Sequence, residues 1–185
     1  MAGSVLKQRS GTAKVLKAAR KPAPGGKADV RVVITPGRRS DFIPMSYADI
    51  YLAAPQERIV FIRAGVPAIV AETTSKAIGF PKEKLFTTLH FARATVNRKI
   101  ASNGLLSQEY SERLLGLRKL IGQVEVMVAE SGTAQGFDAP QWVGQWLEQP
   151  CPALGGEKPV SFMDTLEGQE IVSGVLARIQ SGAYA

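Results

Sequence analysis

Cysteine and histidine are nearly absent from this sequence of 185 residues, which has one of each, Cys151 and His90. A lone cysteine can neither form an internal disulfide nor hold a metal by itself, which fits a reducing cytoplasm. A single histidine leaves too few suitable groups for most hydrolytic and metal-dependent chemistries. We therefore expect no metal, no cofactor and no catalytic residues, and a protein that is not an enzyme.

Long apolar runs are also missing, although 45% of the residues are hydrophobic. No run reaches the roughly 18 residues that a membrane-spanning helix needs. The basic N-terminal segment has no apolar stretch behind it, which argues against a secretory signal. We expect a cytoplasmic protein with no membrane partner and with one core, or two small ones.

The formal net charge is +7, and it is unevenly distributed along the chain. Residues 1–40 contain ten basic residues and one acidic residue, whereas residues 120–185 contain two basic and eight acidic residues. Residues 82–119 carry eight basic and three acidic residues. Positive segments attract polyanions such as DNA and negative segments repel them, so the two ends are expected to meet different partners.

The first 45 residues are expected to form a basic, mobile arm. Residues 1–27 are rich in Lys, Ala, Gly and Ser and offer few large apolar side chains to offset the cost of ordering. Such an arm is either a solvated tail without a role or a non-specific contact to DNA, and both interpretations stay open. Residues 30–34 are one short strand candidate with nothing nearby to pair with.

From Ser46 onward the pattern predicts an all-α fold. Proline and glycine punctuate it, with Pro55 and Pro67 at helix starts and Gly65 and Gly79 at helix ends. The expected helices cover residues 55–64, 67–78, 81–89, 92–102, a long helix capped by Ser107, residues 141–149, and residues 164–180. Residues 150–159 contain three prolines and a Gly-Gly pair and are expected to be irregular.

The long helix carries one apolar stripe with alternating steps of four and three residues. Such spacing places the side chains on one face, which is expected to be core; a dimer seam uses the same spacing and is the second choice. The stripe consists of Tyr110, Leu114, Leu117, Ile121, Val124 and Val128.

Residues 81–89 and 92–102 are a candidate helix-turn-helix, because a tight turn joins two short helices and the second is basic. On that second helix Ala92, Val96 and Ile100 recur every four residues and are expected to face inward. Arginine pairs with guanine, asparagine with adenine and lysine with phosphate, so the opposite face suits a major groove. A solvated basic face is the alternative. The candidate DNA-binding residues are Arg93, Thr95, Asn97, Arg98 and Lys99.

Residues 67–103 resemble the helix-turn-helix of Xre-type antitoxins, in which a Leu-Gly-Ile-Ser turn leads into a basic helix. The corresponding run here is Leu-His-Phe-Ala at 89–92. His90 replaces the turn glycine, which adopts a positive φ at low cost. Ala92 replaces the N-cap serine, a loss of about 1 kcal/mol. Phe86 replaces a small residue that allows close helix packing.

The C-terminal block carries a longer and more specific pattern. A Trp-Leu helix is followed by Pro-x-Pro-Ala-Leu-Gly-Gly-x-x-Pro at 150–159, Asp-Thr-x-x-Gly at 164–168 and Arg-Ile-x-x-Gly-x-Tyr-Ala at 178–185. This pattern resembles the toxin-binding domain shared by Xre, MbcA and ParS antitoxins. Cys151 stands between the two prolines where that family usually has asparagine. The resemblance divides the chain into a helix-turn-helix domain at 46–131 and a toxin-binding domain at 132–185.

Within this block, most of the signature residues are expected to hold the small domain together. Gly155-Gly156 lets the chain reverse between prolines, while Trp146, Leu154 and Ile179 pin the loop and the last helix. Asp164 is expected to begin that helix, with Glu167 completing a capping box. The expected supporting residues are Trp146, Leu154, Gly155, Gly156, Pro159 and Asp164.

The last residues have a different expected role. A Gly-Ala-Tyr-Ala tail is too short to pack much, but its aromatic ring and carboxylate suit another protein's pocket. The resemblance implies that this pocket belongs to a RES-domain toxin that consumes NAD+, with the tail covering the nucleotide site. The expected toxin-binding residues are Arg178, Gly182, Tyr184 and Ala185.

The resemblance thus implies an antitoxin of a type II toxin–antitoxin system that also represses its own promoter. Its expected partners are a RES-domain toxin, operator DNA and a second copy of itself, since repressors that read palindromes are commonly two-fold. The alternative is a stand-alone helix-turn-helix regulator whose C-terminal domain dimerises.

Overall fold

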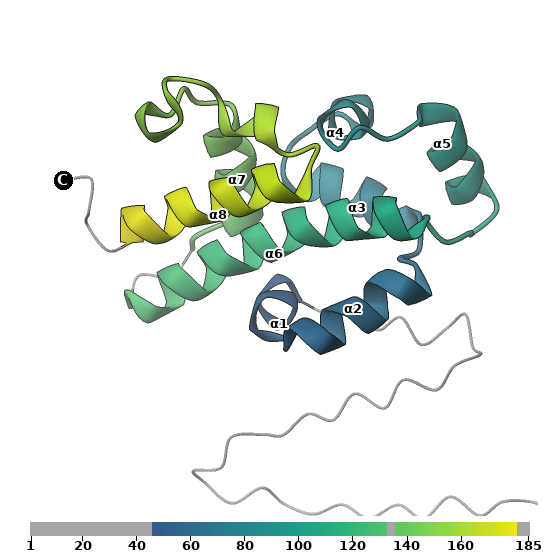
Figure 1. The fold of residues 1–185 in the computed structure, drawn as a ribbon, viewed down its shortest axis with the longest axis horizontal. Coiled ribbons are helices and arrows are strands. Elements are labelled where there is room, and N and C mark those ends of the chain that lie inside the picture. The colour runs from purple at the N-terminus through teal and green to yellow at the C-terminus, as the bar shows by residue number, and fades with distance from the viewer. Residues whose placement is uncertain (1–45, 133–135, 181–185) are drawn as a thin grey trace, which may run out of the picture. The chain divides into compact units, whose positions relative to one another are not determined.

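The computed structural model describes residues 46–132 and 136–180, and every regular element within these ranges is helical (Figure 1). The predicted arm at 1–45 and the strand candidate at 30–34 lie outside the described residues. None of the described helices is long and apolar enough to cross a membrane. The elements are α1 (Tyr47–Leu52), α2 (Pro55–Ala64), α3 (Ile69–Ala77), α4 (Lys82–Thr88), α5 (Arg93–Ala101), α6 (Gln108–Glu130), α7 (Ala139–Leu147), the 3-10 turns η1 (Pro152–Leu154) and η2 (Pro159–Phe162), and α8 (Leu166–Gln180).

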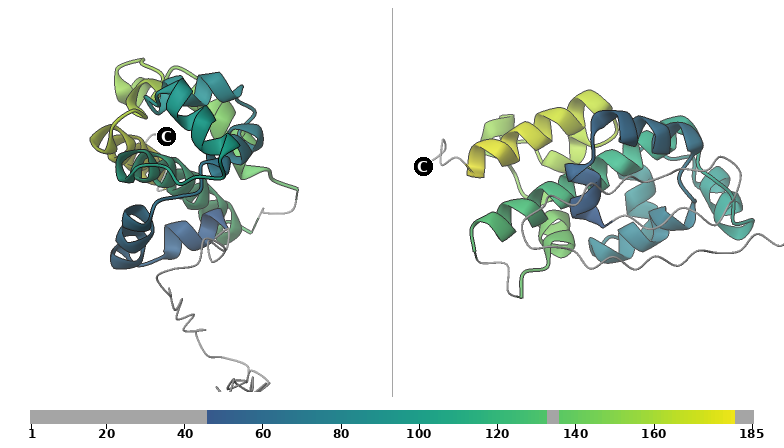
Figure 2. Two further views of the ribbon diagram at one scale, coloured as in Figure 1. Left: turned by 90° about the vertical axis from the view of Figure 1, so that its right-hand side faces the viewer. Right: turned by 90° about the horizontal axis from the view of Figure 1, so that it is seen from below.

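Helix α6 is the element around which the others pack. It begins where the sequence predicts, with the Ser107 hydroxyl accepting a hydrogen bond from the Tyr110 N–H at 3.3 Å. Leu114, Leu117 and Ile121 of its apolar stripe are fully buried, so the stripe is core as expected. Helices α1 and α2 lie on one side of α6 and α8 on the other, with α7 also against it (Figures 1 and 2).

One continuous core runs through both halves of the described chain. It extends from Ile50 in α1 to Leu176 in α8 and includes Val143 and Leu147 of α7. At Gly144 of α7 the backbone approaches the end of α3 so closely that a Cβ atom would lie 1.9 Å from the Ile78 carbonyl oxygen. This close approach fixes α7 against the helix-turn-helix half.

The predicted helix start at Pro67 is wrong, because tertiary pairing takes precedence there. Pro67 forms an isolated antiparallel bridge with Leu105, and the flanking Ala68 N–H donates to the Gly104 carbonyl at 2.9 Å. Helix α3 therefore begins only at Ile69. The bridge ties the segment before α3 to the segment after α5.

The predicted cap of the last helix is displaced by one residue. The Thr165 hydroxyl accepts a hydrogen bond from the Gly168 N–H at 3.1 Å, while Asp164 is exposed in the preceding turn. Helix α8 accordingly begins at Leu166. Its predecessor α7 begins two residues earlier than predicted, since Asp138 caps it by accepting from the Gln141 N–H at 3.0 Å. The segment expected to be irregular contains the turn η1.

Candidate functional site

Helices α4 and α5 form a helix-turn-helix whose turn centres on His90. The His90 backbone has φ of +52°, the conformation for which glycine is usually chosen. The Phe91 N–H donates to the Phe86 carbonyl at 2.7 Å and closes the turn. His90 is therefore a turn residue, as the sequence predicts.

The turn is supported by two side chains from the start of α6. The Ala92 N–H donates to the Tyr110 hydroxyl at 3.1 Å. The Arg113 guanidinium donates to the carbonyls of Leu89 at 2.9 Å and His90 at 3.1 Å. The Arg113 side chain is only 13% exposed and also pairs with a glutamate one turn earlier. These contacts supply hydrogen bonds to a turn that has neither the family's glycine nor its serine.

The large Phe86 side chain is accommodated by the core. It is completely buried in α4, and its ring lies 6.1 Å from that of Phe91, centroid to centroid. The Phe91 ring in turn lies 4.6 Å from that of Tyr110. The three aromatic rings fill the space between the helices, which could pack more closely if residue 86 were small.

Helix α5 presents the predicted polar residues on its outer face. Arg93, Asn97 and Arg98 are exposed, and Thr95 and Lys99 are half-buried on the flanks. Val96 is fully buried, whereas Ala92 is exposed at the N-cap rather than facing inward as predicted.

The basic side chains of α5 are held at both ends of the helix without being neutralised. The Arg93 guanidinium donates to the Thr87 hydroxyl at 3.3 Å, and the Lys99 ammonium donates to the Leu105 carbonyl at 2.5 Å. Helix α5 contains no acidic residue, and no ion pair among the described residues involves it. This face is thus positively charged and suited to phosphate oxygens.

Part of the positive charge of residues 82–119 is buried and does not contribute to the surface of the protein. Arg118 is 8% exposed, lies over the Tyr47 ring at 4.4 Å and donates to the Thr74 hydroxyl at 3.1 Å. Burial lowers the pKa of the Arg118 guanidinium and raises the pKa of the Tyr47 hydroxyl. Sequence reasoning counted this arginine with the surface charge, and no local signal marks it as buried.

In the C-terminal half, the Trp-Leu signature anchors α7. Trp142 and Trp146 stack with ring centroids 5.9 Å apart and planes 7° from parallel. Trp146 is half-buried against the core, and Leu147 is fully buried. Ile179, expected to help here, is instead 45% exposed near the end of α8.

The Gly-Gly pair reverses the chain as predicted. Gly155 and Gly156 have φ of +69° and +86°, which side chains rarely adopt. The Cys151 carbonyl accepts from the N–H groups of Leu154 at 2.9 Å and Gly156 at 3.0 Å, and the Cys151 N–H donates to the Glu157 carbonyl at 2.9 Å. The loop is therefore closed by the backbone of Cys151, while its thiol is buried.

An acidic side chain connects this loop region to the helix-turn-helix. The Glu148 carboxylate, just after α7, lies 3.1 Å from the ammonium of Lys84 in α4 and 3.9 Å from that of Lys158. Pro159, the first residue of η2, is buried beside this region. Glu148 was not among the predicted site residues.

The predicted toxin-binding residues are only partly within the described chain. Arg178 is exposed on α8, on the same outer face as Ile171 and Gly174. Gly182, Tyr184 and Ala185 lie outside the described residues. The structure therefore describes the helix that leads to the tail.

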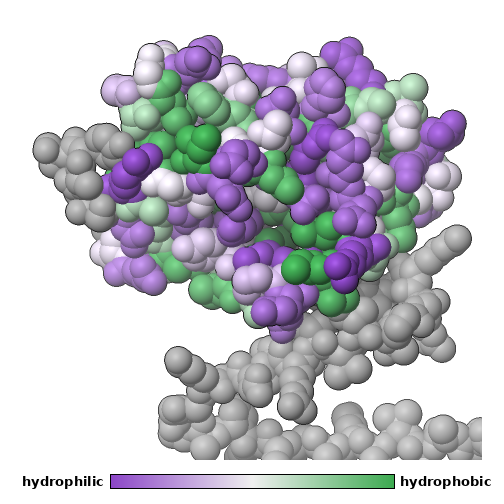
Figure 3. All heavy atoms as spheres, in the orientation of Figure 1, coloured by the Kyte–Doolittle hydropathy of each residue, from purple (hydrophilic) through white to green (hydrophobic). Residues whose placement is uncertain are grey.

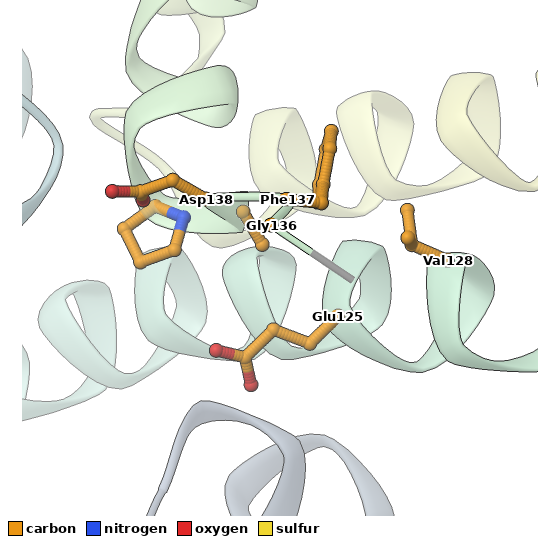
Figure 4. Close-up of a pocket in the computed structure, with 7 residues that line it drawn as sticks. Glu125, Val128, Gly136, Phe137 and Asp138 are labelled. Carbon is orange, nitrogen blue, oxygen red and sulfur yellow. The ribbon is translucent and has the colours of Figure 1, made fainter. Parts of the chain in front are cut away.

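A hollow of about 440 Å³ lies between α6 and the start of α7 (Figure 4). Both carboxylates that line this hollow accept hydrogen bonds from backbone N–H groups at the N-termini of helices. Glu125 accepts from the Ala48 N–H of α1 at 2.9 Å, and Asp138 caps α7. Burial raises the pKa of Glu125. These contacts indicate a structural role for the acidic residues of the hollow.

Comparison with known proteins assigns a family description to each half. Residues 57–119 match the antitoxin Xre-like helix-turn-helix domain, and residues 134–182 match the antitoxin Xre/MbcA/ParS C-terminal toxin-binding domain. The chain is also 50% identical over 142 residues to the Prs ADP-ribosylating antitoxin of Sphingobium sp. (strain YBL2). That alignment covers 77% of this chain and 89% of the relative.

Proposed function

The chain belongs to the Xre/MbcA/ParS family of antitoxins, and on that basis we propose that it neutralises a RES-domain toxin that consumes NAD+ and represses its own promoter. In this proposal residues 46–131 bind DNA and residues 132–185 bind the toxin. The protein acts as a homodimer, as repressors of two-fold operators commonly do.

The toxin class is supported by the relative and by the chemistry of its name. The Sphingobium relative is called a Prs ADP-ribosylating antitoxin. Transfer of an ADP-ribosyl group from NAD+ breaks the bond between nicotinamide and ribose. A toxin that ADP-ribosylates its target therefore consumes NAD+. The observation that carries the proposal for this chain is the match of residues 134–182 to the toxin-binding domain.

The blocking element in this proposal is the end of the chain. Arg178 stands on the exposed face of α8, and Gly182, Tyr184 and Ala185 follow it. The tyrosine ring enters the toxin's nucleotide site and stacks there, and Arg178 contacts the rim. Helix α8 also exposes Glu167 and Glu170, whose negative charge steers it toward a basic, nucleotide-binding surface.

Co-expression with the toxin tests this role. Cellular NAD+ is measured in cells that produce the toxin with wild-type antitoxin, with a chain lacking residues 182–185, or with Arg178→Ala. We expect NAD+ to fall with both variants and to be maintained by wild type. Arg63→Ala, an exposed arginine at the end of α2, is the matched control. Full protection by the truncated chain would remove the tail from the mechanism.

The repressor role is carried by the exposed polar face of α5. Binding to a promoter fragment is measured by fluorescence anisotropy at several salt concentrations for wild type and for the Arg93→Ala, Arg98→Ala double variant. Removing two positive charges from this face is expected to weaken binding and to lower its salt dependence. The Arg63→Ala protein again serves as the control, and equal binding by the double variant would exclude α5 as the recognition helix.

The stand-alone regulator is the weaker candidate. It assigns the C-terminal half to dimerisation alone, whereas residues 134–182 match a toxin-binding domain. Co-purification of a toxin with the chain separates the two functions.

A further inference from the structure

Helix α2 contains the apolar run Ile59, Val60, Phe61 and Ile62 but has no buried residue. Ile59 and Val60 are 43% and 44% exposed, and Leu52 at the end of α1 is 68% exposed. Large apolar side chains on a helix normally pack into the core of their own chain. Helix α2 is therefore incompletely covered by the residues that the structure describes.

A groove of about 240 Å³ runs between α2, α6 and the first two turns of α8. Its floor is formed by Leu115 and Gly116 of α6. Ile59 of α2 stands on one wall and Leu166, which is 42% exposed, on the other. Figure 3 shows hydrophobic side chains over α2 on this face of the molecule, beside a hollow.

The rim of the groove carries both signs of charge. Lys119 and Glu112 come from α6 and Glu170 from α8. None of these three side chains forms an ion pair within residues 46–132 or 136–180. Arg58 also lines the groove, and it donates to the carbonyls at the end of α1, which leaves its positive charge in place. The rim thus carries two positive and two negative groups on one surface.

A surface of this kind is complementary to itself. In a two-fold interface a residue of one chain contacts a second residue of the partner, and the reverse contact forms as well. Lys119 of each chain can then meet a glutamate of the other, so each copy supplies what the other lacks. In addition, removing Ile59 and Leu166 from contact with water favours the same association.

The groove is also placed so that neither proposed activity is obstructed. No residue of α5 lines it, so a partner there leaves the recognition helix accessible. Along α8 the groove extends from Leu166 to Ser173, and Arg178 lies five residues beyond Ser173, about 7.5 Å along the helix axis. Arg178 itself is not among the residues that line the groove.

We propose that a second copy of this chain docks in the groove between α2, α6 and α8, burying Ile59 and Leu166 and pairing Lys119 with Glu112 or Glu170 across the two-fold axis. This inference rests on the dimer of the proposed function and gives that dimer a surface.

The test is the molar mass of the purified full chain by light scattering. Wild type is expected at twice the 19.8 kDa chain mass, and Ile59→Glu and Lys119→Glu at the single-chain mass. Ile171→Glu is the matched control, because Ile171 is also 43% exposed but lies outside the groove, and it is expected to stay dimeric. Circular dichroism checks that each variant is folded.

A mixing experiment isolates self-association. The Lys119→Glu protein and a Glu112→Lys, Glu170→Lys protein each bring like charges together and are expected to be monomeric. Mixed, they bring opposite charges together and are expected to form a heterodimer.

Each contrary outcome is distinct. A wild-type dimer that survives all groove variants removes the groove and leaves the dimer. A monomeric wild type removes the dimer and this inference together, and the toxin is then the occupant if Ile59→Glu loses it in a pull-down. Neither result affects toxin neutralisation or DNA binding by α5, which are measured separately.

Discussion

The hydroxyl oxygen of Tyr110 lies 3.1 Å from the backbone nitrogen of Ala92 and accepts its hydrogen bond. Ala92 is the N-cap of the recognition helix α5 and has no side-chain oxygen of its own. Tyr110 belongs to the first turn of α6, the long helix of the core. The start of the recognition helix is therefore positioned by another helix.

Tyr110→Phe removes this hydrogen bond and retains the ring contact with Phe91. An unmade hydrogen bond of this kind costs about 1 kcal/mol, so the free energy of unfolding is expected to fall by that amount. Urea denaturation measures the change. Tyr51→Phe, on a half-buried tyrosine of α1, is the control, and an equal loss there would show that the Ala92 contact has no special weight.

Ala92→Ser restores a cap to α5. The Ala92 backbone has φ of −70° and ψ of 105°, in the extended region that N-cap residues use. A serine hydroxyl there can accept a hydrogen bond from the first turn, with an expected gain of about 1 kcal/mol in unfolding free energy. Ala94 is also exposed and lies two residues later, in the first turn of the same helix, so Ala94→Ser is expected to give no gain.

Arg113→Ala leaves the carbonyls of Leu89 and His90 without their donor. Charge-assisted hydrogen bonds of this kind contribute about 1.5–3 kcal/mol each, so both stability and operator affinity are expected to drop. The salt slope of DNA binding is expected to stay unchanged, because the 13% exposed Arg113 side chain is directed at the carbonyls of the turn. A lower slope would instead identify Arg113 as a phosphate ligand.

Two helical glycines are expected to respond in opposite directions to alanine. At Gly174, on the outer face of α8, a Cβ atom would meet nothing within 4 Å, so Gly174→Ala should stabilise the free chain by about 0.8–1.0 kcal/mol. At Gly144 a Cβ atom would lie 1.9 Å from the Ile78 carbonyl oxygen, so Gly144→Ala should destabilise it. Thermal unfolding of both variants checks the pair, and equal shifts would contradict the packing described at Gly144.

Glu125→Gln is expected to change how stability depends on pH. Burial raises the folded-state pKa of Glu125 above its ordinary value of 4.5, so the folded chain retains that proton more strongly than the unfolded chain. The associated stability is present below pH 4.5 and is lost as the pH rises through the folded pKa. Urea unfolding should therefore show the variant gaining on wild type as the pH rises from about 4 to 7. A pH-independent difference would contradict the burial of this carboxylate.

Local signals were sufficient for much of the fold. Pro55 and Ser107 start α2 and α6 where the sequence places them, because a helix start depends on one or two neighbouring residues. The helix start predicted at Pro67 is wrong for the opposite reason, because its bridge partner Leu105 is distant in the sequence. Asp164 and Thr165 are adjacent and chemically suited to the same capping role, so composition alone does not choose between them.

The candidate DNA-binding face was also predictable, because helical periodicity alone separates Val96 from Arg93 and Arg98. The support behind that face was not. Arg113 reaches the turn from 23 and 24 residues away, and Arg118 is buried by an aromatic ring from α1. Such contacts depend on how helices meet in space, and a pattern read along one helix does not contain them.

The continuous core has a consequence for building hybrid proteins. One face of α6 serves the helix-turn-helix half, and α7 and α8 are seated on the same helix. A chimaera that joins the front of one antitoxin to the back of another must therefore inherit α6 together with every surface that touches it. Exchanging specificities between relatives will succeed through substitutions on exposed faces, and a splice within the long helix will leave apolar residues without their partners.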